Sequence, residues 1–136
     1  MAACSMQAPE AWTSILSPDA KPKRGEIWRA DLGDGKKRAV AIVSLDQRNL
    51  SDRASSVLAV PFGSYGAEGP TVLRMSPGET GLPGPSYLKA HFIQVLLKNK
   101  LFDRLPRTLS ATQLRELVLM VRCAIDPDAP YGPSTR

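Results

Sequence analysis

The chain has 136 residues, of which 43% are hydrophobic and 23% are charged, so we expect one globular domain rather than a disordered chain. Its net charge of +5 fits a polyanionic or acidic partner. The chain has no apolar run of the about 20 residues that cross a bilayer, and its start lacks a secretory pattern, so we expect a cytoplasmic protein without a membrane partner. One His and two distant Cys make neither a disulfide framework nor a zinc site, so we expect no metal and no cofactor.

The two ends of the chain are predicted to be tails. Residues 1–21 are small, polar and interrupted by Pro, with no sustained periodicity. Residues 127–136 are rich in Pro and cannot continue a helix. The predicted domain therefore comprises residues 22–126.

Most of this domain carries a strand pattern, with short apolar runs bounded by turn residues. The sequence Gly33-Asp34-Gly35 after the first run is a strong turn signal. Pro61 should lie at the end of a strand or at a bulge, because it cannot donate to a ladder. Polar or Gly- and Pro-rich segments at residues 46–53 and 76–85 are predicted loops. The predicted strands are residues 26–32, 38–45, 56–62, 71–75 and 86–97, the last bent near its middle.

The last element has a helical period. Ser110 and Gln113 form a capping box at its start. The apolar residues that follow at helical spacing are Leu114, Leu117, Val118, Val121 and Ile125. Leu119 and Met120 lie off this stripe and are expected at the surface or in a dimer contact. Strands followed by one amphipathic helix predict a mainly β (α+β) fold, a small SH3-like barrel of about five to seven strands.

Basic residues cluster at the start of the domain. Residues 21–38 hold seven Lys and Arg against three Asp and Glu, a net +4 out of the +5 of the whole chain. The run Lys36-Lys37-Arg38 closes the predicted turn. This cluster predicts a nucleic-acid contact, and the alternative is an ordinary solvated face.

Five segments, in the same order, resemble the MazF/PemK family of toxins. The family's first strand opens with Arg-Gly-Asp-Ile-Trp, its second strand opens with Arg, and a Val-Pro-x-Thr-Thr motif follows. A Gly-Leu-x-x-x-Ser motif then precedes the long strand, and a helix closes the domain. The similar segments here are residues 23–32, 38–44, 60–64, 81–87 and 109–125.

This resemblance implies a CcdB-MazF-like barrel that acts as a homodimer. It implies metal-independent cleavage of single-stranded RNA, including mRNA, which leaves a 2′,3′-cyclic phosphate and a 5′-hydroxyl. It also implies a cognate antitoxin, whose acidic segment covers the RNA groove.

The resemblance assigns the working Arg to Arg38 and the hydroxyl to the residue after Val-Pro-x, which is Gly63 here. Ser64, one place on, is the candidate substitute. Arg38 suits a transition-state phosphate as a fixed guanidinium, and the alternative is that it caps a loop or pairs with Asp34. His91 has the only side chain suited to proton transfer, with an unperturbed pKa of about 6.5, and a structural role is the alternative.

Five further residues are candidates for RNA binding. Lys36 and Lys37 would contact phosphates without reading sequence. Phe62 and Tyr65 lie beside the candidate site and would stack on bases. Trp28 is also a stacking candidate, although a place in the core is the alternative.

The functional segments depart from the family pattern. Ala39 follows Arg38 where the family has Pro, and His91-Phe92-Ile93 stands where it has Asp-Gln-Ile. The rival hypothesis is therefore a non-catalytic or degenerate barrel that binds nucleic acid or a protein target such as gyrase.

Overall fold

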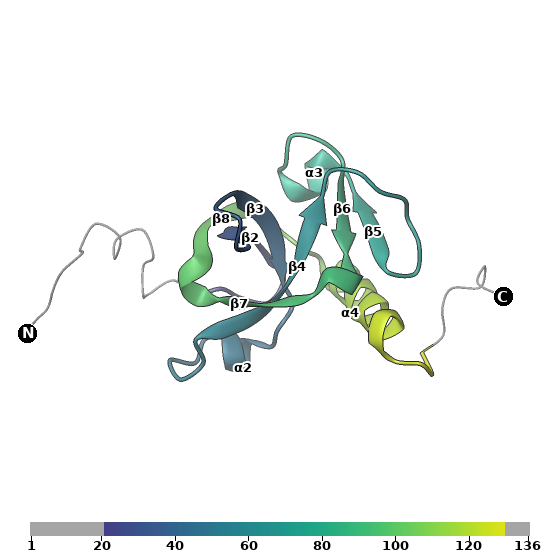
Figure 1. Ribbon diagram of the computed structural model, residues 1–136. Coiled ribbons are helices and arrows are strands. Elements are labelled where there is room, and N and C mark those ends of the chain that lie inside the picture. The colour runs from purple at the N-terminus through teal and green to yellow at the C-terminus, as the bar shows by residue number, and fades with distance from the viewer. Residues whose placement is uncertain (1–20, 130–136) are drawn as a thin grey trace, which may run out of the picture.

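The structure, a computed structural model, describes residues 21–129, so the predicted tails lie outside it except at their inner ends. The elements run along the chain as follows (Figure 1): β2 (Glu26–Asp31), β3 (Lys37–Ile42), α2 (Asp46–Asn49), β4 (Ser56–Gly63), β5 (Val72–Met75), α3 (Pro77–Thr80), β6 (Ser86–Lys89), η1 (Ala90–Phe92), β7 (Gln94–Leu97), η2 (Lys98–Lys100), β8 (Leu101–Thr108) and α4 (Ala111–Ile125).

The seven strands form one antiparallel sheet in the order β5-β6-β4-β3-β2-β8, with β7 also paired to β4. The path does not return to its first strand, so pairing among the described residues leaves the barrel open. Figure 1 shows the long strand β4 between β2, β3 and β8 on one side and β5 and β6 on the other. The predicted class, mainly β with a C-terminal helix, is confirmed.

The predicted strands form, with ends that differ from the prediction by up to three residues. The long run at residues 86–97 is broken by the 3₁₀ turn η1 into β6 and β7, close to the expected bend. Strand β8 was not predicted, because Pro106 and its charged residues hide the strand pattern, yet it pairs with β2. The short helices α2 and α3 form in predicted loops. Ser76 begins α3 with a capping box that includes Glu79, a signal that the sequence does carry.

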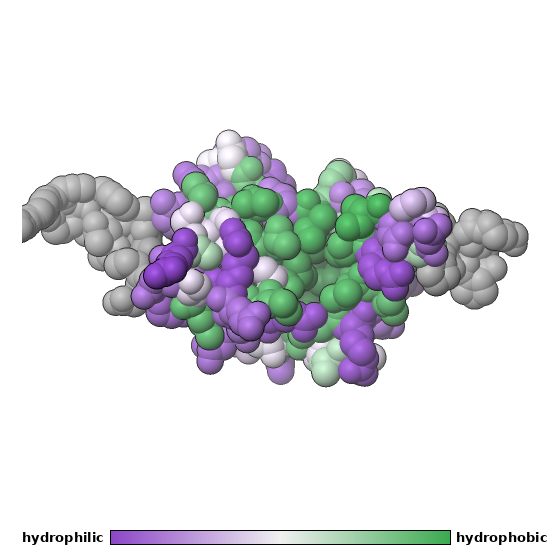
Figure 2. Space-filling model, turned by 90° about the horizontal axis from the view of Figure 1, so that it is seen from below, coloured by the Kyte–Doolittle hydropathy of each residue, from purple (hydrophilic) through white to green (hydrophobic). Residues whose placement is uncertain are grey.

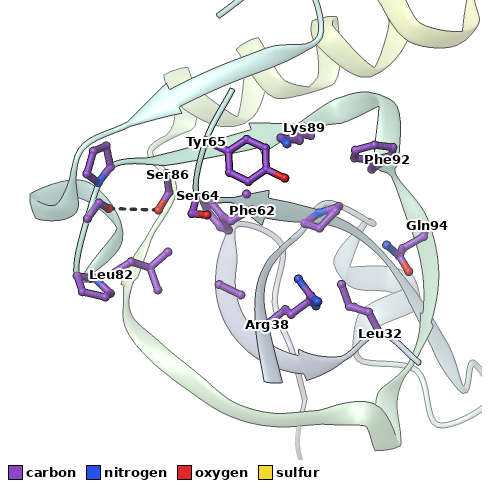
Figure 3. Close-up of a pocket in the computed structure, with 16 residues that line it drawn as sticks. Leu32, Arg38, Phe62, Ser64, Tyr65, Leu82, Ser86, Lys89, Phe92 and Gln94 are labelled. Carbon is purple, nitrogen blue, oxygen red and sulfur yellow. Dashed lines mark hydrogen bonds between the residues drawn. The ribbon is translucent and has the colours of Figure 1, made fainter. Parts of the chain in front are cut away.

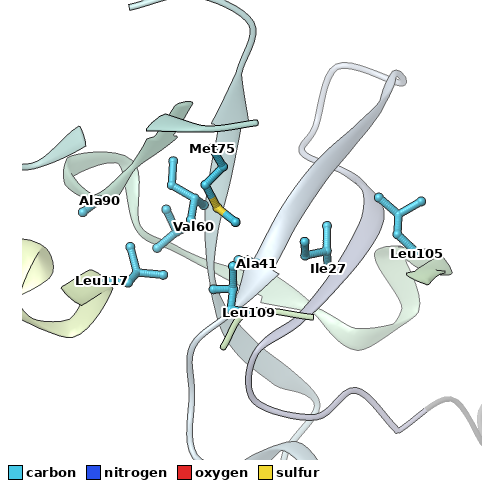
Figure 4. Packing of buried hydrophobic residues seen from close by; sticks show 9 residues of the cluster. Ile27, Ala41, Val60, Met75, Ala90, Leu105, Leu109 and Leu117 are labelled. Carbon is cyan, nitrogen blue, oxygen red and sulfur yellow. The ribbon is translucent and has the colours of Figure 1, made fainter. Parts of the chain in front are cut away.

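Two hydrophobic clusters hold the sheet, one on each face. Ile27, Ala41 and Val60 lie in the first cluster with Leu117 of α4 (Figure 4). Trp28 belongs to the second cluster, together with Val40, Ile42 and Val57 from β3 and β4. Neighbouring residues of one strand enter different clusters because side chains alternate between faces. This explains the nearly continuous apolar sequence of β3.

Helix α4 has the predicted start and a narrower buried stripe than predicted. The Ser110 Oγ accepts from the Gln113 backbone N–H at 3.1 Å, and the Gln113 Oε1 accepts from the Ser110 N–H at 2.8 Å. Leu117 is fully buried, but Val118 and Ile125 are 39% and 71% exposed, so their expected burial is wrong. Met120 instead packs against the first cluster. The helix packs mainly on η1 at the edge of the sheet, so few of its side chains reach the core.

One face of the molecule carries exposed apolar side chains. Figure 2 shows a band of hydrophobic residues across the middle of the face seen from below, with hydrophilic residues on both sides. Leu58 of β4 and Val95 of β7 are paired across the sheet and are 38% and 66% exposed. Leu97 and Leu119 are also exposed. Such a surface is typical of a protein contact. No helix among residues 21–129 has the length and hydrophobicity that a membrane span requires.

The burial of Leu117 predicts its contribution to stability. Leu117→Ala removes a fully buried side chain at the contact between α4 and the sheet. The free energy of unfolding should fall by about 2–5 kcal/mol, measured by denaturant titration. Leu45→Ala, the same change at a residue that is 61% exposed, is the control and should cost no more than about 0.5 kcal/mol. Equal losses would contradict this account of the core.

Candidate functional site

An open pocket of about 730 Å³ lies where the ends of β3, β4 and β6 meet the loop before β6. In the view of Figure 3, Arg38 and Leu32 lie on one side of it and Tyr65 and Lys89 on the other. The lining consists of Leu32, Arg38, Ala39, Pro61, Phe62, Gly63, Ser64, Tyr65, Leu82, Pro83, Gly84, Pro85, Ser86, Lys89, Phe92 and Gln94. It contains two cationic side chains and no carboxylate.

Strand register brings distant parts of the sequence to this pocket. Strand β3 pairs with β4 through Val40 and Pro61, and the same register continued by two residues sets Arg38 opposite Gly63. On its other edge β4 pairs with β6, with Gly63 opposite Tyr87. Gly63 therefore lies between the start of β3 and the strand that ends at Lys89, and Ser64 follows it directly.

Arg38 is held by one carboxylate at the pocket. Its Nε and Nη2 donate to the Asp34 Oδ2 at 2.9 and 2.7 Å. The alternative that Arg38 pairs with Asp34 therefore holds, but the pair is open to solvent, with 48% and 42% of the two side chains exposed. The Nη1 of Arg38 makes no hydrogen bond within residues 21–129. The guanidinium is thus oriented by Asp34 and still has donors for a ligand.

The turn between β2 and β3 fixes Asp34 in this place. The Asp31 carboxylate accepts from the backbone N–H groups of Gly33 and Gly35 at 2.8 and 3.1 Å. The predicted turn is confirmed. Gly33 and Gly35 both have positive φ, a backbone conformation that glycine adopts more readily than other residues. The Arg38 guanidinium, and after it the Lys36 backbone N–H, hold the pKa of the Asp34 carboxyl below its usual range.

The other candidates that line the pocket come from the end of β4 and the loop that follows it. Ser64, Phe62 and Tyr65 all contribute to the lining, and Tyr65 is 77% exposed. The ammonium of Lys89 lies 5.0 Å from the centroid of the Tyr65 ring, a cation–π contact. Lys89 was missed by sequence reasoning, because nothing in the pattern of β6 distinguishes it from a surface lysine.

Four sequence candidates lie outside the pocket lining. The Nδ1 of His91 lies 2.9 Å from the Thr71 Oγ1, and its ring contacts Phe92. Trp28 is only 8% exposed and its Nε1 donates to Glu26, so its ring offers no open face to a base. Lys36 and Lys37 are exposed beside Arg38, and Lys37 lies over the Phe102 ring. The pocket lining thus brings together Arg38, Ser64, Phe62 and Tyr65, and the other four candidates are not part of it.

The chemistry available in the pocket is anion binding beside flat rings. Arg38 and Lys89 supply positive charge, Ser64 supplies a hydroxyl, and Phe62 and Tyr65 supply aromatic surface. In the part of the chain that the structure describes, no three His, Cys, Asp or Glu side chains gather in a way that would hold a metal ion. A single-stranded nucleic acid matches this combination, because its phosphates need cations and its bases stack on rings.

Comparisons with known proteins also point to proteins that act on RNA. A family model described as a PemK-like, MazF-like toxin of type II toxin–antitoxin systems matches residues 23–123. An endoribonuclease in complex with its cognate antitoxin, from a mycobacterial species, is similar at 29% identity over 80% of this chain and 99% of its own, with a TM-score of 0.67. Another mycobacterial endoribonuclease is similar at 27% identity over 82% and 97%, with a TM-score of 0.67.

A chain of a MazE–MazF structure from Deinococcus radiodurans shares the fold at 18% identity, covering 79% of this chain and 98% of its own, with a TM-score of 0.65. None of the curated proteins matches the chain by sequence.

The ion pair between Arg38 and Asp34 leads to a testable prediction for the pKa of Asp34. Arg38→Met removes the main cause that lowers this pKa, so it should rise toward its ordinary value of 3.8 while the Lys36 N–H keeps it slightly below. The pair contributes stability above pH 3.8 that is lost as the pH falls through the lowered pKa of the folded state. NMR titration of the side-chain carboxyl groups measures the shift.

Asp52 is the internal control, because its pKa is lowered mainly by Lys21 and should not change. An unchanged Asp34 pKa in the Arg38→Met protein would show that the pair does not form in solution.

Proposed function

Because the chain belongs to the PemK-like, MazF-like toxin family of type II toxin–antitoxin systems, we propose that it is an endoribonuclease that cleaves single-stranded RNA, including mRNA, in the pocket beside Arg38. The two mycobacterial structures, which are 29% and 27% identical to this chain, are both described as endoribonucleases, and this supports the proposal.

The observation that carries this proposal is that Arg38 and Ser64 line the same pocket. Both side chains border one open pocket whose lining holds no carboxylate, so a phosphodiester can enter between them. Phe62 and Tyr65 lie in the same pocket and would stack on the bases that flank the phosphate. Lys36 and Lys37, exposed beside Arg38, would contact phosphates outside it.

The proposed reaction uses the RNA's own 2′-hydroxyl as the nucleophile, so positioning is the main task of the protein. The 2′-oxygen forms a bond to phosphorus, and the bond from phosphorus to the 5′-oxygen breaks. The proton leaves the 2′-hydroxyl and a proton joins the 5′-oxygen. The products are a 2′,3′-cyclic phosphate and a 5′-hydroxyl, and no metal or cofactor takes part.

Arg38 stabilises the negative charge that builds on the phosphorus oxygens. Its Nη1 has no partner among the described residues, so the guanidinium donates to the phosphate while Asp34 holds Nε and Nη2. Arg38 cannot act as the base, because an Arg pKa exceeds about 12. Ser64 donates a hydrogen bond to a phosphate oxygen. The proposal gives His91 no step, because its Nδ1 is engaged in a hydrogen bond with the Thr71 Oγ1 outside the pocket lining. Solvent carries the protons.

The proposal includes two partners, in the cytoplasm. One is a cognate antitoxin whose acidic segment covers the cationic pocket, as the mycobacterial complex is described with its cognate antitoxin. The other is a second copy of the chain, joined through the exposed apolar residues Leu58, Val95 and Leu119. Sedimentation at micromolar concentration distinguishes one chain of 14.7 kDa from two.

Two observations favour the rival function, a non-catalytic barrel that binds nucleic acid or a protein such as gyrase. Gly63 offers no hydroxyl between Arg38 and Ser64, and Asp34 neutralises part of the charge of Arg38. Either feature, the missing hydroxyl or the ion pair, would weaken cleavage without preventing the binding of nucleic acid.

The proposal predicts cleavage of a long single-stranded RNA by the purified protein, with products that carry a 2′,3′-cyclic phosphate. Arg38→Ala should lower the rate by about 100- to 1000-fold, because it removes a preorganised donor. Ser64→Ala should lower it less. A chelator should have no effect. Arg115→Ala, an exposed change on α4, is the control and should cleave like the wild type.

Intact RNA at high protein concentration, together with growth arrest on expression, would reject the nuclease and favour the rival. Equal rates for Arg38→Ala and wild type would place the activity elsewhere.

A further inference from the structure

The space beside Gly63 is filled by Lys89. A Cβ built on Gly63 would lie 3.0 Å from the Lys89 Nζ and 2.8 Å from its Cε, and the second distance is shorter than real Cβ atoms show. A Cβ on Gly66 would lie 3.6 Å from the same Cε. The end of the Lys89 side chain therefore occupies the volume that a larger residue at position 63 would need, next to the place where register sets Arg38.

The packing around Lys89 holds it there without neutralising it. Its ammonium lies over the Tyr65 ring at 5.0 Å, and the residue is half-buried. Within residues 21–129 this ammonium makes no hydrogen bond and no ion pair. Arg38, by contrast, is paired with Asp34. Lys89 is thus the cation of the pocket lining whose charge no carboxylate offsets.

We propose that Lys89 is a second phosphate-binding residue of this pocket, and that the absence of a side chain at Gly63 leaves the space that the Lys89 ammonium occupies. Lys89 binds an RNA phosphate across the pocket from Arg38 (Figure 3), with Tyr65 beside it for a base. An ammonium with three donors suits a single phosphate as a compact charge. This inference rests on the proposed function, because it names how that same pocket holds RNA.

The test measures binding of a mixed-sequence, 2′-O-methylated single-stranded RNA by fluorescence anisotropy at several salt concentrations. Methylation removes the nucleophile, so binding is read apart from cleavage. Lys89→Met keeps most of the packing volume and removes the charge. It should weaken binding about tenfold and lower the slope of log affinity against log salt by about 0.7, the value for one phosphate contact to a single strand. Lys89→Arg should keep the slope.

Lys23→Met is the matched control. It removes the same charge from an exposed lysine that belongs to the basic segment 21–38 but lies outside the pocket lining, at the opposite end of the β2–β3 hairpin from Arg38. Its affinity and its salt slope should stay close to those of the wild type.

A substitution at position 63 provides a second test, because a side chain there would compete with the end of Lys89 for the same volume. Gly63→Ala adds only the Cβ that meets the flexible end of Lys89 and brings no hydroxyl to the pocket, so the protein should fold, and thermal unfolding checks this. In the wild type this change should weaken RNA binding severalfold. In the Lys89→Met background it should add no comparable loss, since the charge that it displaces is already gone.

The inference is overturned if Lys89→Met binds like the wild type, if Lys23→Met loses as much, or if the wild type does not bind the RNA. RNA cleavage by the wild type with equal binding by Lys89→Met would reject Lys89 and keep the nuclease. Binding that depends on Lys89 with no cleavage of unmodified RNA would reject the nuclease and keep the phosphate site.

Discussion

Strand β4 pairs with β3 along one edge and with β6 along the other, and this double pairing determines where the pocket lies. It places Gly63 between the start of β3, where Arg38 lies, and the end of β6, where Lys89 lies. A slip of one residue on either edge would turn these side chains to the opposite face. The two hydrophobic clusters prevent such a slip, because each face of β3 and β4 is buried in one of them. The core therefore sets the geometry of the charged groups.

The electrostatics of the pocket depend on an asymmetry between its two cations. Asp34 holds the Arg38 guanidinium through two hydrogen bonds, which fixes its orientation and places a negative charge beside it. Lys89 has an aromatic ring for a neighbour and forms no ion pair among residues 21–129. An oriented donor is effective where charge develops in a transition state, since it needs little reorganisation. An unpaired ammonium is effective in attracting and holding a polyanion. In the proposed function, Arg38 therefore serves the chemical step and Lys89 serves the binding of RNA.

Sequence patterns predict the strands and the helix well, because alternation, turn residues and the Ser110 capping box are local signals. They fail for β8, whose Pro106 and charges conceal a strand held by its pairing with β2. For the site, the chain position of Arg38 and its family resemblance are enough to single it out. Lys89 is not predictable, because its proposed role depends on its packing beside Gly63, which exists only in the folded sheet. Trp28 takes the place in the core that its sequence offered as the alternative to stacking, as part of the second cluster.

The central claim is that Arg38 and Lys89 hold an RNA backbone in the pocket between β3 and β6. The most direct measurement is a crystal structure of the protein with a short, 2′-O-methylated single-stranded RNA. The account predicts a phosphate within hydrogen-bonding distance of the Arg38 guanidinium, a phosphate on the Lys89 ammonium, and a base against Tyr65. RNA bound on another face, with the Asp34–Arg38 pair and the Lys89–Tyr65 contact undisturbed and the pocket free of phosphate, would contradict it.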